Sequence, residues 1–108
     1  LPSMRPDRMV QFVERVFCGL DEAAIERHRG TFEAYTRFNG SITHAAQSLF
    51  IHKNTMQNHL NAIAKDTGYN PRTLHDYAVL DMAFRVHDYL RFAGVASRGA
   101  DGRGTEKR

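Results

Sequence analysis

The sequence predicts an all-α fold, a small bundle of about five helices that contains a helix-turn-helix. Three observations support this fold class. Proline occurs only at positions 2, 6 and 71, so most of the chain can remain helical. Apolar residues recur at spacings of three and four, and no stretch of useful length alternates with a period of two. Glycine or asparagine follows several of the periodic stretches, as is common at helix C-termini.

Length and composition limit the class of protein. The chain has 108 residues, 42% of them hydrophobic and 25% charged, which fits one globular domain and excludes two of full size. No stretch resembles a membrane span or a signal peptide. The single cysteine, Cys18, is typical of a reducing cytoplasm. Because the chain starts at Leu1, we expect it to be part of a longer protein whose absent portion binds any effector.

The first two helices are predicted from apolar spacing and capping residues. A helix should start near Asp7 and end near Gly19, and residues 1–20 are a candidate dimerisation element. Its apolar stripe comprises Met9, Phe12, Val13, Val16 and Phe17. Asp21 is the expected N-cap of a second helix, which should end at Asn39-Gly40.

Two helices joined by a very short turn should follow. Ser41 caps a short helix of about residues 42–50. After a turn around Ile51, a longer helix should run from about Lys53 to Thr67 and end at Gly68. This succession is the helix-turn-helix pattern, in which the second helix enters the major groove of DNA.

The last helix should span about residues 73–92 and complete a helix-turn-helix domain of residues 21–92. It carries two apolar stripes, namely Val79, Met82, Val86 and Leu90, and Leu74, Tyr77, Leu80 and Phe84. Either the helix is central in the bundle, or one stripe pairs with a second protomer; we favour the dimer. Residues 93–108 are rich in Gly, Ser, Arg and Lys, and we expect a disordered tail.

The distribution of charge is more informative than its sum. The net charge is only +3, from 15 Lys and Arg against 12 Asp and Glu. Between Glu33 and Asp66, however, the chain has no carboxylate, and this window coincides with the predicted helix-turn-helix. A surface that approaches phosphates needs such a window, because each carboxylate would repel them.

The helix at 53–67 has an unusual outward face. At 100° per residue, Met56, Leu60 and Ile63 form an apolar stripe about 60° wide. The opposite arc carries one lysine and four carboxamides, namely Lys53, Asn54, Gln57, Asn58 and Asn61. Carboxamides donate and accept hydrogen bonds together and match adenine in the major groove. The alternative is a solvated face that happens to be rich in asparagine.

The start of the preceding helix adds further candidates. Ser41, Thr43 and His44 lie in or beside its first turn, where hydroxyl and N–H groups could hold a DNA phosphate. For Ser41 a capping role is expected in either case. For Thr43, plain exposure to solvent is an equally good interpretation.

The segments Thr31–Tyr35 and Asn39–Thr55 resemble the C-terminal helix-turn-helix domain of PucR-type regulators, which include purine-catabolism and sugar-diacid regulators. The string Leu49 to Thr55 is the most specific part, and the likeness continues to about Leu90. A more distant similarity is to the factor for inversion stimulation. The resemblance implies a bacterial transcription-factor module that binds double-stranded DNA as a homodimer. It also implies that Lys53, Asn54 and Thr55 approach the DNA.

The chain departs from the PucR pattern inside the longer helix. The family often has Arg-Tyr-Arg after its Asn-Thr-Leu motif, whereas this chain has Gln57, Asn58 and His59 after Met56. Fewer ionic contacts predict weaker binding with a shallower dependence on salt.

Other functional classes have little support in the sequence. No cysteine–histidine signature, zinc-ligand spacing or phosphate loop is present, so we expect no enzyme activity, no metal and no cofactor. The remaining alternative is a helical module for protein–protein interaction without specific DNA binding.

Overall fold

The computed structural model describes residues 5–101, and the side chains through residue 94. Its helices are α1 (Pro6–Phe17), α2 (Glu22–Arg37), α3 (Ile42–Ser48), α4 (Lys53–Thr67) and α5 (Leu74–Asp101). The all-α fold class with a helix-turn-helix is therefore confirmed for the described part of the chain. None of these helices has the length and apolar content needed to cross a bilayer.

Side chains cap three helices where the chain turns sharply. The Asp21 carboxylate accepts from the N–H of Ala24 at 2.8 Å, and the Ser41 hydroxyl accepts from the N–H of His44 at 3.3 Å. Both capping residues were predicted. His52, expected in the turn or as a helix cap, caps α4: the N–H of Asn54 donates to His52 Nδ1 at 3.0 Å. These caps satisfy N–H groups that have no partner inside the helix, and so they fix where each helix begins.

Two predicted helix ends were wrong. Helix α3 stops at Ser48, not near residue 50, because Phe50 has a left-handed φ of 59°. Helix α5 continues to Asp101, past the predicted end at Phe92 and into the segment expected to be disordered. The last part of the predicted tail, residues 102–108, lies outside the described residues.

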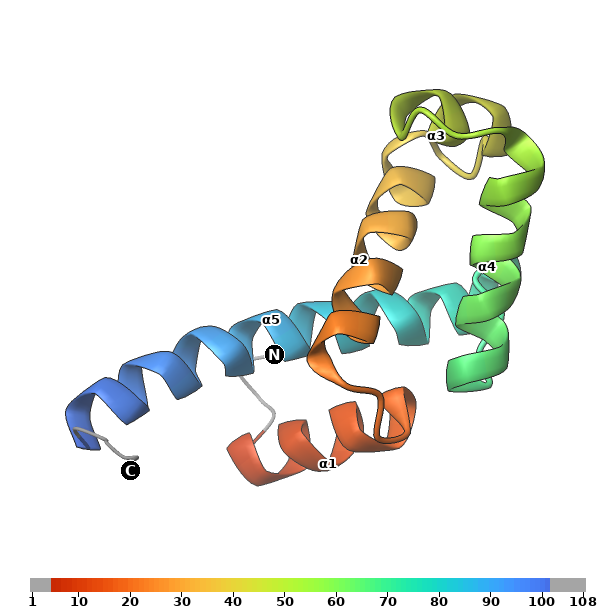
Figure 1. The fold of residues 1–108 in the computed structure, drawn as a ribbon. Coiled ribbons are helices and arrows are strands. Elements are labelled where there is room, and N and C mark those ends of the chain that lie inside the picture. Colours follow the sequence, from red (N-terminus) through yellow and green to blue (C-terminus); the bar gives the residue numbers. More distant parts are fainter. Residues whose placement is uncertain (1–4, 102–108) are drawn as a thin grey trace.

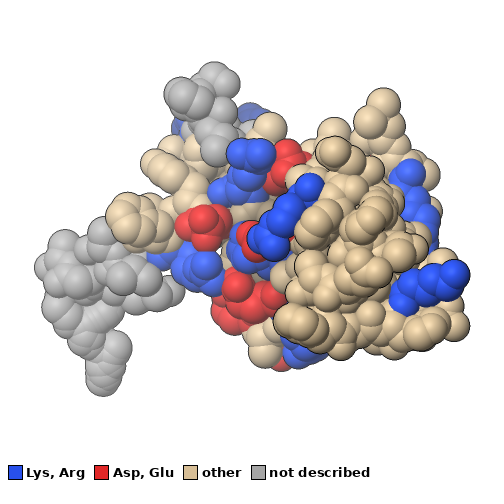
Figure 2. All heavy atoms as spheres, turned by 90° about the horizontal axis from the view of Figure 1, so that it is seen from above, with Lys and Arg blue, Asp and Glu red and all other residues tan. Residues whose placement is uncertain are grey.

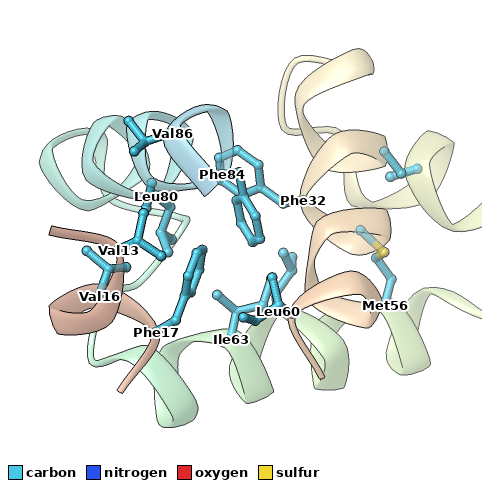
Figure 3. Close-up of a cluster of buried hydrophobic side chains, with 14 of the residues drawn as sticks. Val13, Val16, Phe17, Phe32, Met56, Leu60, Ile63, Leu80, Phe84 and Val86 are labelled. Carbon is cyan, nitrogen blue, oxygen red and sulfur yellow. The ribbon is translucent and has the colours of Figure 1, made fainter. Parts of the chain in front are cut away.

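The core lies between α5 and the other long helices (Figure 1). Helix α1 packs along α5, and α2 packs against α4. Phe84 of α5 joins these layers, because its ring centroid lies 5.0 Å from that of Phe17 and 5.1 Å from that of Phe32 (Figure 3). The predicted stripe of α4, Met56, Leu60 and Ile63, is fully buried.

The two apolar stripes of α5 mostly face inward. Leu80 and Val86 are fully buried, and Phe84 is nearly so. Helix α1 packs along α5, and Phe84 contacts both Phe17 of α1 and Phe32 of α2, so this part of the helix is central in the bundle. Leu74 and Met82, one from each stripe, are nevertheless exposed, and pairing with a second protomer stays a prediction.

Candidate nucleic-acid interface

The outward face of α4 carries the polar residues that the angular analysis placed there. Met56, Leu60 and Ile63 anchor the opposite side of the helix in the core, which fixes its rotation. The five side chains of this face are all exposed, namely those of Lys53, Asn54, Gln57, Asn58 and Asn61, and those of His59 and Lys65 are exposed as well. Thr55, the remaining candidate on α4, is only half-buried and lies toward the edge of this face. We call the lysine and the four carboxamides, Lys53, Asn54, Gln57, Asn58 and Asn61, the polar face of α4.

The first turn of α3 brings together two of the three residues expected there. Ser41 Oγ lies 2.8 Å from His44 Nδ1, and the His44 ring stacks on Phe38 with centroids 6.3 Å apart. These contacts orient the imidazole, so it is less free than the sequence suggested. Thr43 is exposed in the same turn.

The turn between α3 and α4 presents a residue that sequence reasoning did not single out. The Phe50 side chain is 95% exposed, although phenylalanine is usually buried. Its left-handed backbone reverses the chain while Leu49 and Ile51 stay partly in contact with the domain. No periodic signal predicts the exposure, because Phe50 lies in an apolar run of the sequence.

Arg72 is a second residue that the sequence did not place at this surface. It follows α4 in the loop before α5, and its Nη1 donates to Asn61 Oδ1 at 3.0 Å. Its Nη2 donates to the carbonyl oxygen of Gln57 at 3.4 Å. The contact adds an exposed guanidinium beside the polar face and leaves the Asn61 amide NH₂ able to donate outward. Only the path of the loop around Pro71 brings it there.

The surface around α3 and α4 differs in charge from the rest of the visible face. Acidic and basic side chains alternate over the part that includes the middle of α5 (Figure 2). The part above α3 and α4 shows Lys and Arg at its edge and no acid (Figure 2). Asp66, the acid that ends the carboxylate-free window, lies 2.7 Å from Nε2 of the buried His28. The region next to the polar face is therefore favourable for an anion.

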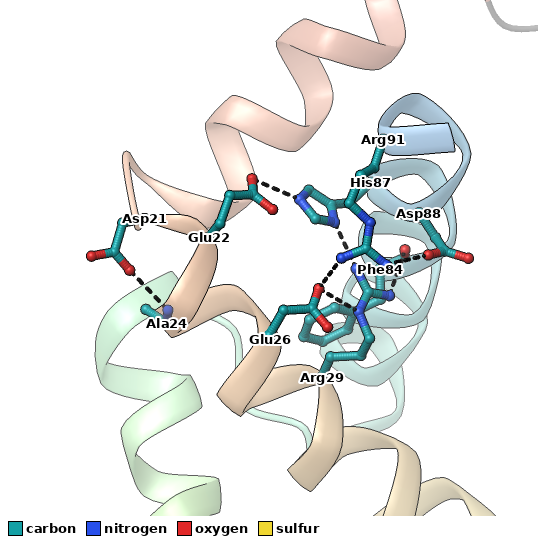
Figure 4. A network of polar contacts seen from close by, with 9 residues as sticks. All are labelled: Asp21, Glu22, Ala24, Glu26, Arg29, Phe84, His87, Asp88 and Arg91. Carbon is teal, nitrogen blue, oxygen red and sulfur yellow. Dashed lines mark hydrogen bonds and ion pairs between the residues drawn. The ribbon is translucent and has the colours of Figure 1, made fainter. Parts of the chain in front are cut away.

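The described residues contain one group with ligand atoms close enough for a metal ion: Glu22, Glu26 and His87. Its contacts are those of an ion-pair network joining α2 to α5 (Figure 4). Burial raises the pKa of Glu26, but hydrogen bonds and charges from Arg29 and Arg91 outweigh this and leave the pKa below its usual value. His87 Nδ1 lies 2.6 Å from Arg29 Nη2 and therefore accepts a hydrogen bond. The positively charged guanidiniums of Arg29 and Arg91 lie at these ligand atoms, and they disfavour the binding of a metal cation there.

Comparison with known families agrees with this geometry. A model of the PucR C-terminal helix-turn-helix domain matches residues 29–86. This range includes α3, the turn, α4 and the part of α5 from Leu74 to residue 86. Neither the curated proteins nor the solved structures yield a match to the chain. Since the match extends over more than half of the 108 residues, the chain belongs to the PucR C-terminal helix-turn-helix family.

Proposed function

We propose that this domain binds double-stranded DNA in a sequence-specific manner, with α4 in the major groove. Membership of a helix-turn-helix family points to a non-enzymatic, DNA-binding regulator. The observation that carries the finer proposal is the polar face of α4, which has four carboxamides, one lysine and no acid. Such a face offers donors and acceptors to base edges and has no carboxylate that would repel phosphates.

Each part of the interface has a proposed role. Asn54, Gln57 and Asn58 read base edges, and Asn61 does so through its NH₂ group, because Arg72 holds its oxygen. Lys53 and Thr55, with Ser41, Thr43 and His44 of α3, contact the sugar-phosphate backbone. Arg72 supplies one cation near the positions where the family often has arginines and this chain has Gln57 and His59.

The domain would act as the C-terminal module of a bacterial transcriptional regulator, in the cytoplasm. It would bind as a two-fold homodimer, so that two copies of α4 reach successive turns of the major groove. An effector, if one exists, would bind another part of the regulator.

Two substitutions on α4 should have different effects on DNA binding. Asn58→Ala should lower affinity for the preferred duplex by about 1–3 kcal/mol and affect a scrambled duplex less, because a base contact is lost. Lys53→Ala should weaken both duplexes alike and reduce the slope of log K against log salt by about 1. Fluorescence anisotropy on both duplexes at two salt concentrations measures these effects.

The controls for this experiment lie on α1, away from the polar face. Arg8→Ala and Gln11→Ala remove exposed side chains of similar type and should leave both affinities unchanged. If the wild-type chain shows no salt-dependent binding to any duplex, the domain is a protein-interaction module instead. If both α4 variants bind like wild type, α4 does not contact the DNA.

A further inference from the structure

Helix α5 has an exposed, largely apolar face, which includes Leu74 and Met82 of the two predicted stripes. Leu74 is 87% exposed, Met82 39%, Tyr89 52% and Phe92 78%. Ala78 and Arg85 are exposed at intermediate positions. At 100° per residue, these six side chains fall within an arc of about 80°. We call them the outer face of α5.

Such a face is unusual on a helix of a monomer. Of the seven large apolar side chains that are exposed in the described part of the chain, four lie on this one arc. Single exposed apolar residues are normal, but contiguous ones mark an interaction surface. The opposite side of α5 is already buried in the core, so this helix has apolar side chains on two sides, of which only one is covered within the chain.

We propose that a second copy of this chain covers the outer face, with the two α5 helices antiparallel and the two-fold axis near Arg85. The proposal rests on the DNA-binding function above and specifies which surface forms its dimer. A two-fold interface uses the same patch on both copies, so the outer face must complement itself.

The order of side chains along α5 allows this self-complementarity. When two antiparallel helices cross at Arg85, Met82 of one copy lies beside Tyr89 of the other, and Ala78 lies beside Phe92. The Phe92 ring, the most exposed large apolar side chain of the outer face after Leu74, thus meets the small Ala78 side chain, and no two aromatic rings compete for the same position. Parallel pairing would instead place Phe92 against Phe92 and Ala78 against Ala78, which packs poorly.

The charges bordering the outer face do not oppose the approach of a second copy. Asp81 pairs with Arg85 of the same helix at 3.1 Å, and Asp88 pairs with Arg91 at 2.9 Å. Each acid at the border is therefore neutralised within its own chain. Arg85, the cation nearest the proposed axis, already has its counterion as well.

The length of α5 gives the pair the spacing that DNA requires. Helix α4 lies beside the N-terminal end of α5, to which a short loop connects it (Figure 1). From Leu74 to an axis at Arg85, eleven residues rise about 16.5 Å, so the two N-terminal ends lie about 33 Å apart along the helix direction. One turn of DNA separates successive major-groove sites by about 34–36 Å.

Sedimentation without DNA tests the interface. The wild-type chain should be a dimer at high micromolar concentration, and the double substitution Tyr89→Glu with Phe92→Glu should weaken dimerisation by about tenfold or more. Val10→Glu, which adds a charge at an exposed apolar position of α1, should behave like wild type. A monomeric wild type, or equal weakening by both variants, would overturn the proposal. All of these residues are exposed, so circular dichroism should show unchanged helicity.

Cross-linking tests the orientation of the pair. In a Cys18→Ser background, a short bifunctional maleimide should join Met82→Cys chains to Tyr89→Cys chains when the two are mixed. Each variant alone should cross-link much less. Efficient cross-linking of each variant to itself would show parallel pairing and overturn the antiparallel arrangement.

Measurements of DNA binding distinguish a failure of the proposed dimer interface from a failure of the proposed DNA-binding function. The monomeric double variant should still bind a duplex with one half-site as wild type does, but should lose the tighter binding to two half-sites. If wild type binds no duplex while sedimentation shows the dimer, the DNA-binding function fails and the interface stands.

Discussion

Replacing Arg29 with methionine should lower the free energy of unfolding by about 3 kcal/mol. The Arg29 side chain is almost fully buried between α2 and α5. Its guanidinium donates to the carbonyl oxygen of Phe84 at 3.2 Å and to His87 Nδ1 at 2.6 Å. Methionine fills similar space but donates no hydrogen bond, so the buried His87 nitrogen loses its partner. Urea unfolding followed by circular dichroism measures the loss.

The matched control is Arg27→Met on the same helix. Arg27 is exposed, so the same chemical change there should alter stability by no more than about 0.5 kcal/mol. Equal effects at both positions would mean that the network between α2 and α5 adds nothing beyond an ordinary surface arginine.

Replacing Gln57 with glutamate should lower affinity for every duplex by about tenfold or more. The two side chains have nearly the same shape, so the change adds a charge without altering the helix. The carboxylate would stand in the middle of the polar face of α4, where phosphates repel it, and it would no longer donate to base edges. The loss should shrink as salt is raised, because salt screens the repulsion. Anisotropy titrations over a series of salt concentrations measure both effects.

Gln11→Glu is the control for charge alone. It makes the same substitution on α1, at an exposed position away from α4, and changes the net charge by the same amount. We expect little change in affinity for this variant. If both substitutions weaken binding equally, the total charge governs affinity and α4 has no special position.

The face of α4 was predictable from sequence because helix geometry alone relates its residues. Once Met56, Leu60 and Ile63 were assigned to the core, the positions of Gln57 and Asn58 followed from 100° per residue. The caps Asp21 and Ser41 were predictable for a similar reason, since each acts on N–H groups of the helix that it begins.

Contacts that join distant parts of the chain were not predictable in this way. His87 lies in the core-facing stretch of the last helix, and nothing near it in sequence indicates Arg29 as its partner. Arg72 reaches Asn61 only because the loop after α4 turns back along that helix. The C-terminal end of α5 was missed because the composition after Phe92 resembles a linker, whereas Asp101 still belongs to the helix.

The sequence by itself determined the all-α class, the helix-turn-helix, the family and the side of α4 that faces outward, because periodicity and capping act within a few residues. Only the tertiary structure decided which faces of α5 are covered. Leu80, Phe84 and Val86 of the predicted stripes are buried, whereas Leu74 and Met82 of the same stripes are exposed together with Tyr89 and Phe92. The physical reason is that burial depends on which helices pack together, and packing joins residues far apart in the chain.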